Sequence, residues 1–240
     1  MVSVAHLLQA QDTLLDGLVD PSVLRDTAGI GVRFRDMFLR SKQIADSLEV
    51  WEQKAIRLSS QMSGASAATG TLEDNCMRHG YEFFNTIMRY WFICMILTSR
   101  TWLLFRRISQ IIPPSAFTSA PGGLPGVPDP QRFAANIARN CHHYFDAEAG
   151  LWGAQNASLS MGGALHYYAA TGQFDSPGMT ELRRVLREYK GAQFTVGFLK
   201  SMAADPAPEG LKGDTSVPQE HIRMAANWFG LDRIAPAGAQ

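Results

Sequence analysis

The 240-residue sequence has few cysteines, no net charge and no long uninterrupted apolar run. Its three cysteines, Cys76, Cys94 and Cys141, are far apart and form no C-x-x-C pair. This spacing argues against a zinc ribbon and against a secreted disulfide framework. The 22 basic and 22 acidic residues cancel, so the chain has no global positive field that would hold nucleic acid. We therefore expect no direct binding to nucleic acid.

The N-terminus lacks the basic and continuously apolar segments of a secretion signal. We expect an intracellular protein in a reducing compartment, and no compact basic run distinguishes the nucleus from the cytoplasm. The most apolar segment, from Tyr90 to Thr98, is about 9 residues long against the roughly 20 that cross a bilayer. Arg89 and Arg100 bracket it. A buried helix is therefore expected here rather than a membrane span.

The sequence predicts an all-α fold built around one helix at about residues 79–110. This segment is apolar nearly all the way round, which predicts burial on most sides. No segment of useful length alternates with the two-residue period of a strand. We expect a single domain, residues 1–240, with about eight helices.

The other helices follow from apolar residues at three- to four-residue spacing. They are expected at residues 3–18, 32–60, 130–146, 158–171, 180–190, 192–203 and 219–229. Small, polar, proline-rich or glycine-rich segments predict linkers near residues 59–71, 113–129 and 204–218. Asp129 and Pro130 form a helix start, Gly191 is the expected C-cap of helix 180–190, and Gly162 and Gly163 indicate close helix packing.

The densest group of polar side chains is Cys141, His142, His143 and Asp146. If the helix continues through them, His142 and Asp146 share one face at i,i+4 spacing, and the carboxylate orients the imidazole for acid–base catalysis. His143 then points about 100° away. The alternative is that Cys141 belongs to the core and both histidines lie on the helix flank, satisfied by solvent or backbone. No metal-ligand spacing is present, and no cofactor is expected.

His166 extends this hypothesis to an aromatic pocket. Facing helix 130–146, it would complete a pocket that suits a small hydrophobic or aromatic ligand. The residues that would line it are Trp91, Trp102, His143, Tyr144, Trp152 and Tyr168. The alternative is that these aromatic side chains simply fill the core. The sequence contains no G-x-S-x-G elbow, phosphate-binding glycine loop or dinucleotide fingerprint.

Several stretches share their order and aromatic placement with a known family. They are Ile44, Leu48 and Trp51 before a variable loop, the Tyr81–Leu104 segment, Asn136–Phe145, Met161–Ala170 with Phe174, and Leu182–Gly191 before a terminal helix. Over roughly residues 40–205 the chain resembles the C-terminal half of the fungal-specific transcription factor domain. That helical region follows the DNA-binding zinc cluster in fungal regulators.

The chain departs from the family in two respects. It has neither the six closely spaced cysteines nor the basic segment of the DNA-binding module, and it starts partway into the family domain. We expect either a separately expressed relative or a truncated regulator.

The resemblance implies a regulatory or effector-binding module linked to transcription regulation and secondary metabolism. Two alternatives stay open. The first is a cofactor-independent cyclase, isomerase or lyase of secondary metabolism that uses His142, Asp146 and His166. The second is a helical adaptor that binds a protein partner, or a second copy of itself, through helices 32–60 and 180–190.

Overall fold

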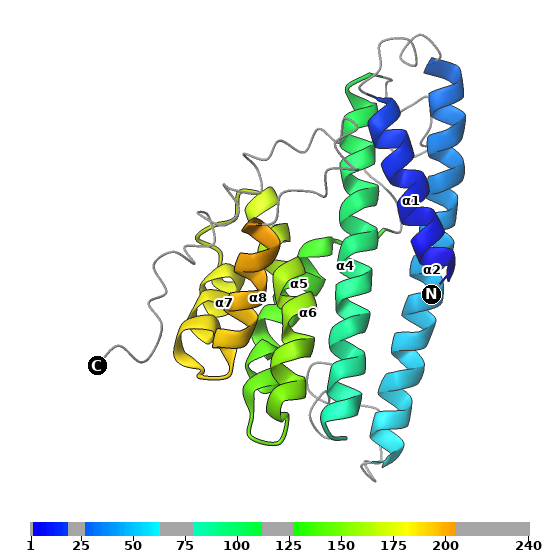
Figure 1. The fold of residues 1–240 in the computed structure, drawn as a ribbon. Helices are drawn as coiled ribbons and strands as arrows, with labels where there is room; N and C mark the ends of the chain where they lie inside the picture. Colours follow the sequence, from blue (N-terminus) through cyan, green and yellow to red (C-terminus); the bar gives the residue numbers. More distant parts are fainter. Residues whose placement is uncertain (1, 19–26, 63–78, 112–126, 205–240) are drawn as a thin grey trace. The chain divides into compact units, whose positions relative to one another are not determined.

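The structure, a computed structural model, describes residues 2–18, 27–62, 79–111 and 127–204 (Figure 1). Every regular element in these ranges is a helix, which confirms the predicted all-α fold of about eight helices. The elements are α1 (Val2–Gly17), α2 (Thr27–Met62), α4 (Tyr81–Ser109), α5 (Pro130–Asn140), the 3-10 helix η3 (Cys141–Phe145), α6 (Gly150–Ala170), α7 (Pro177–Glu188) and α8 (Ala192–Ala204).

The chain forms two compact units. The first unit comprises Met1–Arg78 with Ile93–Phe133, and the second comprises His79–Phe92 with Ala134–Gln240. Helix α4 therefore contributes its N-terminal half to the second unit and its C-terminal half to the first. The single domain expected from the sequence stays a prediction.

The first unit is held together by an apolar cluster from α1, α2 and the C-terminal half of α4. Its buried members are Leu7, Leu14, Ile30, Phe34, Met37, Leu97, Leu104, Phe105 and Ile108. A polar bridge lies beside them, because the Gln11 side-chain amide donates to Ser41 Oγ at 3.2 Å and to Thr101 Oγ1 at 3.1 Å. One α1 side chain thus joins all three helices.

Helix α2 begins at Thr27 rather than after Gly31, where the sequence predicted it to start. Gly29 and Gly31 lie near the start of α2, and each helical glycine costs only about 1 kcal/mol relative to alanine. Ile30 is 1% exposed and lies between the two glycines. Burial of the isoleucine side chain, worth roughly 1.5–3 kcal/mol, offsets the combined cost of about 2 kcal/mol for the two glycines and allows the helix to start before them.

The prediction of a buried helix near residues 79–110 is confirmed by α4. Most of its apolar side chains are buried, including Phe84, Ile87 and Trp91 at 0% exposure. The exposed positions Glu82, Thr86 and Arg89 follow one another at three- to four-residue spacing, so the N-terminal half also has a narrow solvated stripe. The helix begins two residues later and ends one residue earlier than predicted.

Helix α5 starts as predicted. Asp129 Oδ1 accepts a hydrogen bond from the backbone N–H of Gln131 at 2.9 Å, and Pro130 is the first helical residue. The helix does not reach residue 146, because the α-helical pattern ends at Asn140 and a 3-10 helix follows.

Small residues let the helices of the second unit approach closely. A Cβ at Gly153 would overlap the carbonyl oxygen of Tyr144, and a Cβ at Gly162 would lie 2.8 Å from Leu199 Cδ2. The close contact at Gly162 confirms the predicted packing role of this glycine. Helix α6 begins at Gly150 rather than at residue 158, and Gly153 lets η3 cross its first turn.

Helix α7 begins three residues before the predicted start. Ser176 Oγ accepts from the backbone N–H of Met179 at 3.2 Å, and Pro177 occupies the first turn. The predicted C-cap Gly191 is wrong, because the extended backbone of Tyr189 ends the helix. Gly191 instead lies beside the Phe145 ring, to which an added Cβ would approach within 3.3 Å.

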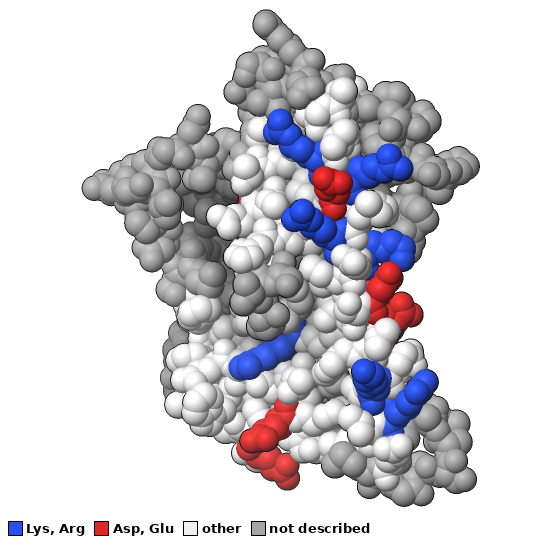
Figure 2. Space-filling model, turned by 90° about the vertical axis from the view of Figure 1, so that its right-hand side faces the viewer, with Lys and Arg blue, Asp and Glu red and all other residues white. Residues whose placement is uncertain are grey.

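Four predictions fall largely outside the described residues. They are the linkers near residues 59–71, 113–129 and 204–218, of which only short flanking parts are described, and the helix at 219–229. Residues 59–62, predicted as linker, belong to α2. Figure 2 shows one face of the molecule, on which Lys and Arg side chains are interspersed with Asp and Glu. On α2, Lys42 and Asp46 form an ion pair at 2.8 Å.

Candidate functional site

The candidate site lies where α5 changes into the 3-10 helix η3. The Asn140 side-chain amide donates to the carbonyl of Asn136 at 2.9 Å, an i−4 bond that offers the backbone an alternative to the helical ladder. Cys141 Sγ donates to the carbonyl of Ala138 at 3.2 Å. From Cys141 to Phe145 the chain then follows i→i+3 geometry.

This change of helix type changes the partner of Asp146. Residues three apart eclipse one another in a 3-10 helix, and His143 Nδ1 lies 2.9 Å from Asp146 Oδ2. The predicted pairing of His142 with Asp146 at i,i+4 is therefore wrong. It assumed that the α-helix continues to residue 146, whereas the α-helical spacing ends at Asn140.

The two histidine rings lie against each other, with centroids 3.9 Å apart and an interplanar angle of 39°. They do not point about 100° apart, as an α-helix would place them. His143 also contacts Phe84 edge-on at 5.8 Å. Burial lowers the pKa of His142, and the neighbouring His143 lowers it further, while Asp146 opposes the shift. His142 Nδ1 is buried without a hydrogen-bond partner.

Acidic and basic groups of α7 complete the surroundings of His142. Glu181, which interacts electrostatically with His142, accepts two hydrogen bonds from Arg184 at 2.8 and 2.6 Å. Arg184 also donates to Glu188 at 2.7 Å. The hydrogen bonds from Arg184 lower the pKa of Glu181. Glu181 is therefore held as a carboxylate rather than left available as a proton donor.

Sequence reasoning missed this carboxylate–guanidinium network. The signal was present, because Glu181, Arg184 and Glu188 stand at i,i+3 and i,i+4 spacing on one helix. What the sequence did not show is that η3 lies against α7.

Tyr144 is a core residue of the second unit. Its side chain is 0% exposed, its hydroxyl lies 3.2 Å from Ser160 Oγ, and Phe84 packs edge-on at 4.9 Å. Burial raises the pKa of Tyr144 well above its ordinary value. Cys141 is also 0% exposed, and burial raises the pKa of its thiol. Both residues therefore stay protonated and inert at neutral pH.

Of the other predicted ligand-binding aromatics, one is exposed and three are buried or partly buried. Trp152 is 72% exposed, so it does not line an enclosed pocket. Trp102 belongs to the first unit, where it packs edge-on against Phe105 at 6.0 Å. Trp91 is 0% exposed in the second unit and its Nε1 is buried without a hydrogen-bond partner. Tyr168 reaches α7, where a Cβ at Gly178 would overlap its hydroxyl.

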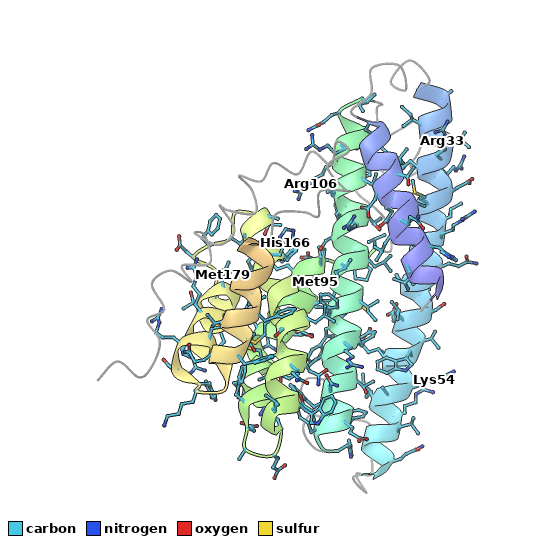
Figure 3. All side chains as sticks on the ribbon, viewed as in Figure 1. Arg33, Lys54, Met95, Arg106, His166 and Met179 are labelled. Carbon is cyan, nitrogen blue, oxygen red and sulfur yellow. The ribbon has the colours of Figure 1, made fainter. Side chains whose placement is uncertain are left out.

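His166 lies on the exposed side of α6, near the C-terminal end of that helix (Figure 3). The backbone of η3 crosses α6 at Gly153, and the Tyr144 side chain reaches Ser160. His166 is roughly 20 Å beyond Gly153 along the helix axis, at ~1.5 Å per residue. The structure therefore does not bring His166 to the histidine pair. The predicted trio of His142, Asp146 and His166 is not assembled.

Within the residues that the structure describes, no group of three or more His, Cys, Asp or Glu side chains is placed to hold a metal ion. None of the described helices has the length and apolar character needed to span a membrane. What remains at η3 is a histidine–carboxylate pair, His143 and Asp146, that has the geometry for proton transfer and is partly open to solvent.

Comparison with protein-family models, with curated proteins and with solved structures gives no match to this chain.

Proposed function

We propose that this chain is a regulatory or effector-binding module that acts without catalysis. The observation that carries the proposal is the scatter of the candidate catalytic residues. His166 is exposed at one end of α6, whereas His143 and Asp146 pair on η3. Acid–base catalysis by these groups needs them around one substrate position. Their separation favours a module that works through binding.

The sequence resemblance supplies the kind of regulation. The segments Tyr81–Leu104 and Asn136–Phe145 are similar to the helical region of fungal transcription factors, and in the structure they supply α4, α5 and η3. The proposal therefore extends to transcription regulation in the nucleus, linked to secondary metabolism. The chain would act through a partner or an effector rather than through a zinc cluster of its own.

A tethering experiment tests this proposal. The chain is fused to an unrelated DNA-binding domain, and transcription of a reporter is measured in a fungal host. We expect transcription to change relative to the DNA-binding domain alone, and the change to persist in the His142→Ala/His166→Ala variant. Ile137→Asp, which buries a charge at a 0% exposed position, serves as the unfolded control. Unchanged transcription with the folded chain contradicts the proposal.

A cofactor-independent enzyme remains the second candidate, and one observation favours it. His143 and Asp146 form a hydrogen-bonded pair at 2.9 Å, the arrangement in which a carboxylate orients a catalytic imidazole. Extracts of a fungal host would be incubated with wild-type protein and with His143→Gln. A compound consumed by the wild type and spared by the variant supports this candidate, and identical extracts count against it.

A further inference from the structure

Helix α6 presents a long exposed surface without charge. Residues 149–174 contain no Asp, Glu, Lys or Arg, yet Leu151, Trp152 and Leu159 are 65%, 72% and 56% exposed. A helix face exposed to solvent ordinarily carries charged and polar residues. The outer face of α6 has the composition of a buried one.

Helix α8 lies beside α6 and runs in the same direction (Figure 1). Thr195 Oγ1 donates to the carbonyl of Ala154 at 2.9 Å, and Leu199 lies against Gly162, so residue numbers rise together along the contact. On α8, Phe194 and Phe198 are 48% and 43% exposed. The two helices therefore both expose large apolar side chains next to their contact.

The exposed residues of the two helices lie on one side of the pair. Successive residues are rotated by about 100° about the helix axis. Viewed along α8, Phe194 and Phe198 are rotated in one sense from Thr195, which contacts α6. Viewed along α6, Leu151 and Leu159 are rotated in the opposite sense from Ala154, which contacts α8. In a parallel pair, opposite rotations bring the side chains to the same side. Leu151, Trp152, Leu159, Phe194 and Phe198 thus form one surface, named here the α6–α8 face.

The α6–α8 face has the size of a functional apolar patch. Aromatic side chains carry roughly 150–250 Å² each, and with the two leucines the exposed apolar area is on the order of 500 Å². The largest apolar patch on a monomeric protein is ordinarily about 300–600 Å² and is often functional. A standard interface buries about 800 Å² on each partner, including its polar rim. The α6–α8 face supplies the apolar centre of such an interface.

We propose that the α6–α8 face is the interface of a symmetric dimer with a second copy of this chain. A two-fold interface sets a patch against its own copy, so any charge in the patch meets the same charge. The five side chains of the α6–α8 face are uncharged and avoid that repulsion. Arg89 of α4, which donates to Asn156 Oδ1 at 2.8 Å beside Trp152, belongs to the polar rim of the face. A lipid surface is the poorer occupant, because helices that lie on membranes carry Lys and Arg to hold anionic headgroups, and residues 149–174 have none. This inference does not depend on the proposed regulatory function.

Sedimentation equilibrium of the full chain at micromolar concentration tests the proposal. We expect wild-type protein at twice the 26.4 kDa chain mass. Leu159→Glu should weaken the dimer by on the order of 100-fold or more, because the two glutamates face each other. Leu39→Glu is the matched control, since Leu39 is 54% exposed on α2 and outside the face. Circular dichroism checks that each variant is folded.

Phe198→Glu repeats the test from α8 and replaces Leu159→Glu if that variant does not fold. A dimer that is lost in either face variant and kept in Leu39→Glu supports the proposal. A wild-type monomer at every concentration overturns it, including a monomer that binds phosphatidylcholine vesicles, which would assign the face to lipid. A dimer that survives both face variants also overturns it, because the interface would then lie elsewhere.

Discussion

His143 Nδ1 lies 2.9 Å from Asp146 Oδ2, whereas His142, the residue four positions before Asp146, lies within electrostatic reach of Glu181 on α7. Neighbouring histidines thus have different environments. His143 has a carboxylate partner within its own 3-10 turn, and His142 has a buried Nδ1 without a hydrogen-bond partner. The two should therefore respond differently to substitution.

The free energy of unfolding should fall as pH decreases because of His142. Burial lowers the pKa of His142 in the folded protein, while the unfolded chain titrates near pH ~6.5. The unfolded state then binds more protons, so stability is lost as pH falls through about 6.5. The lowered pKa of Glu181 acts only at more acidic pH, where the carboxylate protonates.

Urea unfolding at pH values of about 7.5 and 5.5 measures this effect. We predict a smaller loss of stability in His142→Gln than in the wild type over this interval. His6→Gln, at an exposed position on α1, should keep the wild-type pH dependence. An unchanged pH dependence in His142→Gln would show that another group is responsible.

Gly153→Ala should destabilise the protein by about 1–3 kcal/mol or more, the usual cost of overpacking. An added Cβ would overlap the Tyr144 carbonyl oxygen, and backbone cannot move aside as a flexible side chain can. Gly197→Ala is the matched control in α8, where a Cβ meets no atom within 4 Å. It should stabilise by roughly 0.5–1 kcal/mol. Chemical denaturation distinguishes them, and similar effects would contradict the close crossing of η3 and α6.

Gln11→Ala should cost more stability than Gln11→Met. Alanine leaves a cavity and removes the hydrogen bonds to Ser41 and Thr101, so we expect a loss of about 2 kcal/mol. Methionine keeps the volume and also removes Gln11 Oε1, which is buried without a partner. Its cost should be below about 1 kcal/mol. The order of urea midpoints checks this, and equal losses would mean that packing contributes nothing at this position.

Apolar residues at three- to four-residue spacing predicted the helices well, because in the folded protein they form the buried face of each helix. Leu182, Val185 and Leu186 are all buried in α7, as their spacing indicated. Boundaries were harder to predict. The start of α2 depends on burial of Ile30, and the start of α6 depends on the close approach of Tyr144 to Gly153. These are tertiary effects that local pattern does not contain.

The candidate site was only partly predictable for the same reason. The polar group at residues 141–146 was found from the sequence, but its pairing was not, because one change from α to 3-10 geometry moves the carboxylate from His142 to His143. Trp152 is typical of a pocket residue by type, and only its 72% exposure removes it. Whether an aromatic side chain on an uncharged helix is exposed depends on which other elements pack against it, and the local sequence pattern does not show those elements.

Native mass spectrometry of protein purified from a fungal host tests the central claim most directly. Wild type and the His142→Ala/His166→Ala variant are compared, and any molecule that co-purifies is extracted and identified. A module that acts without these histidines predicts the same bound species, chemically unchanged and in the same proportion, in both proteins. A compound that the variant holds as an unconverted precursor of the one bound by the wild type, with an intact circular dichroism spectrum, would contradict the account, because it would show these histidines carrying out a reaction.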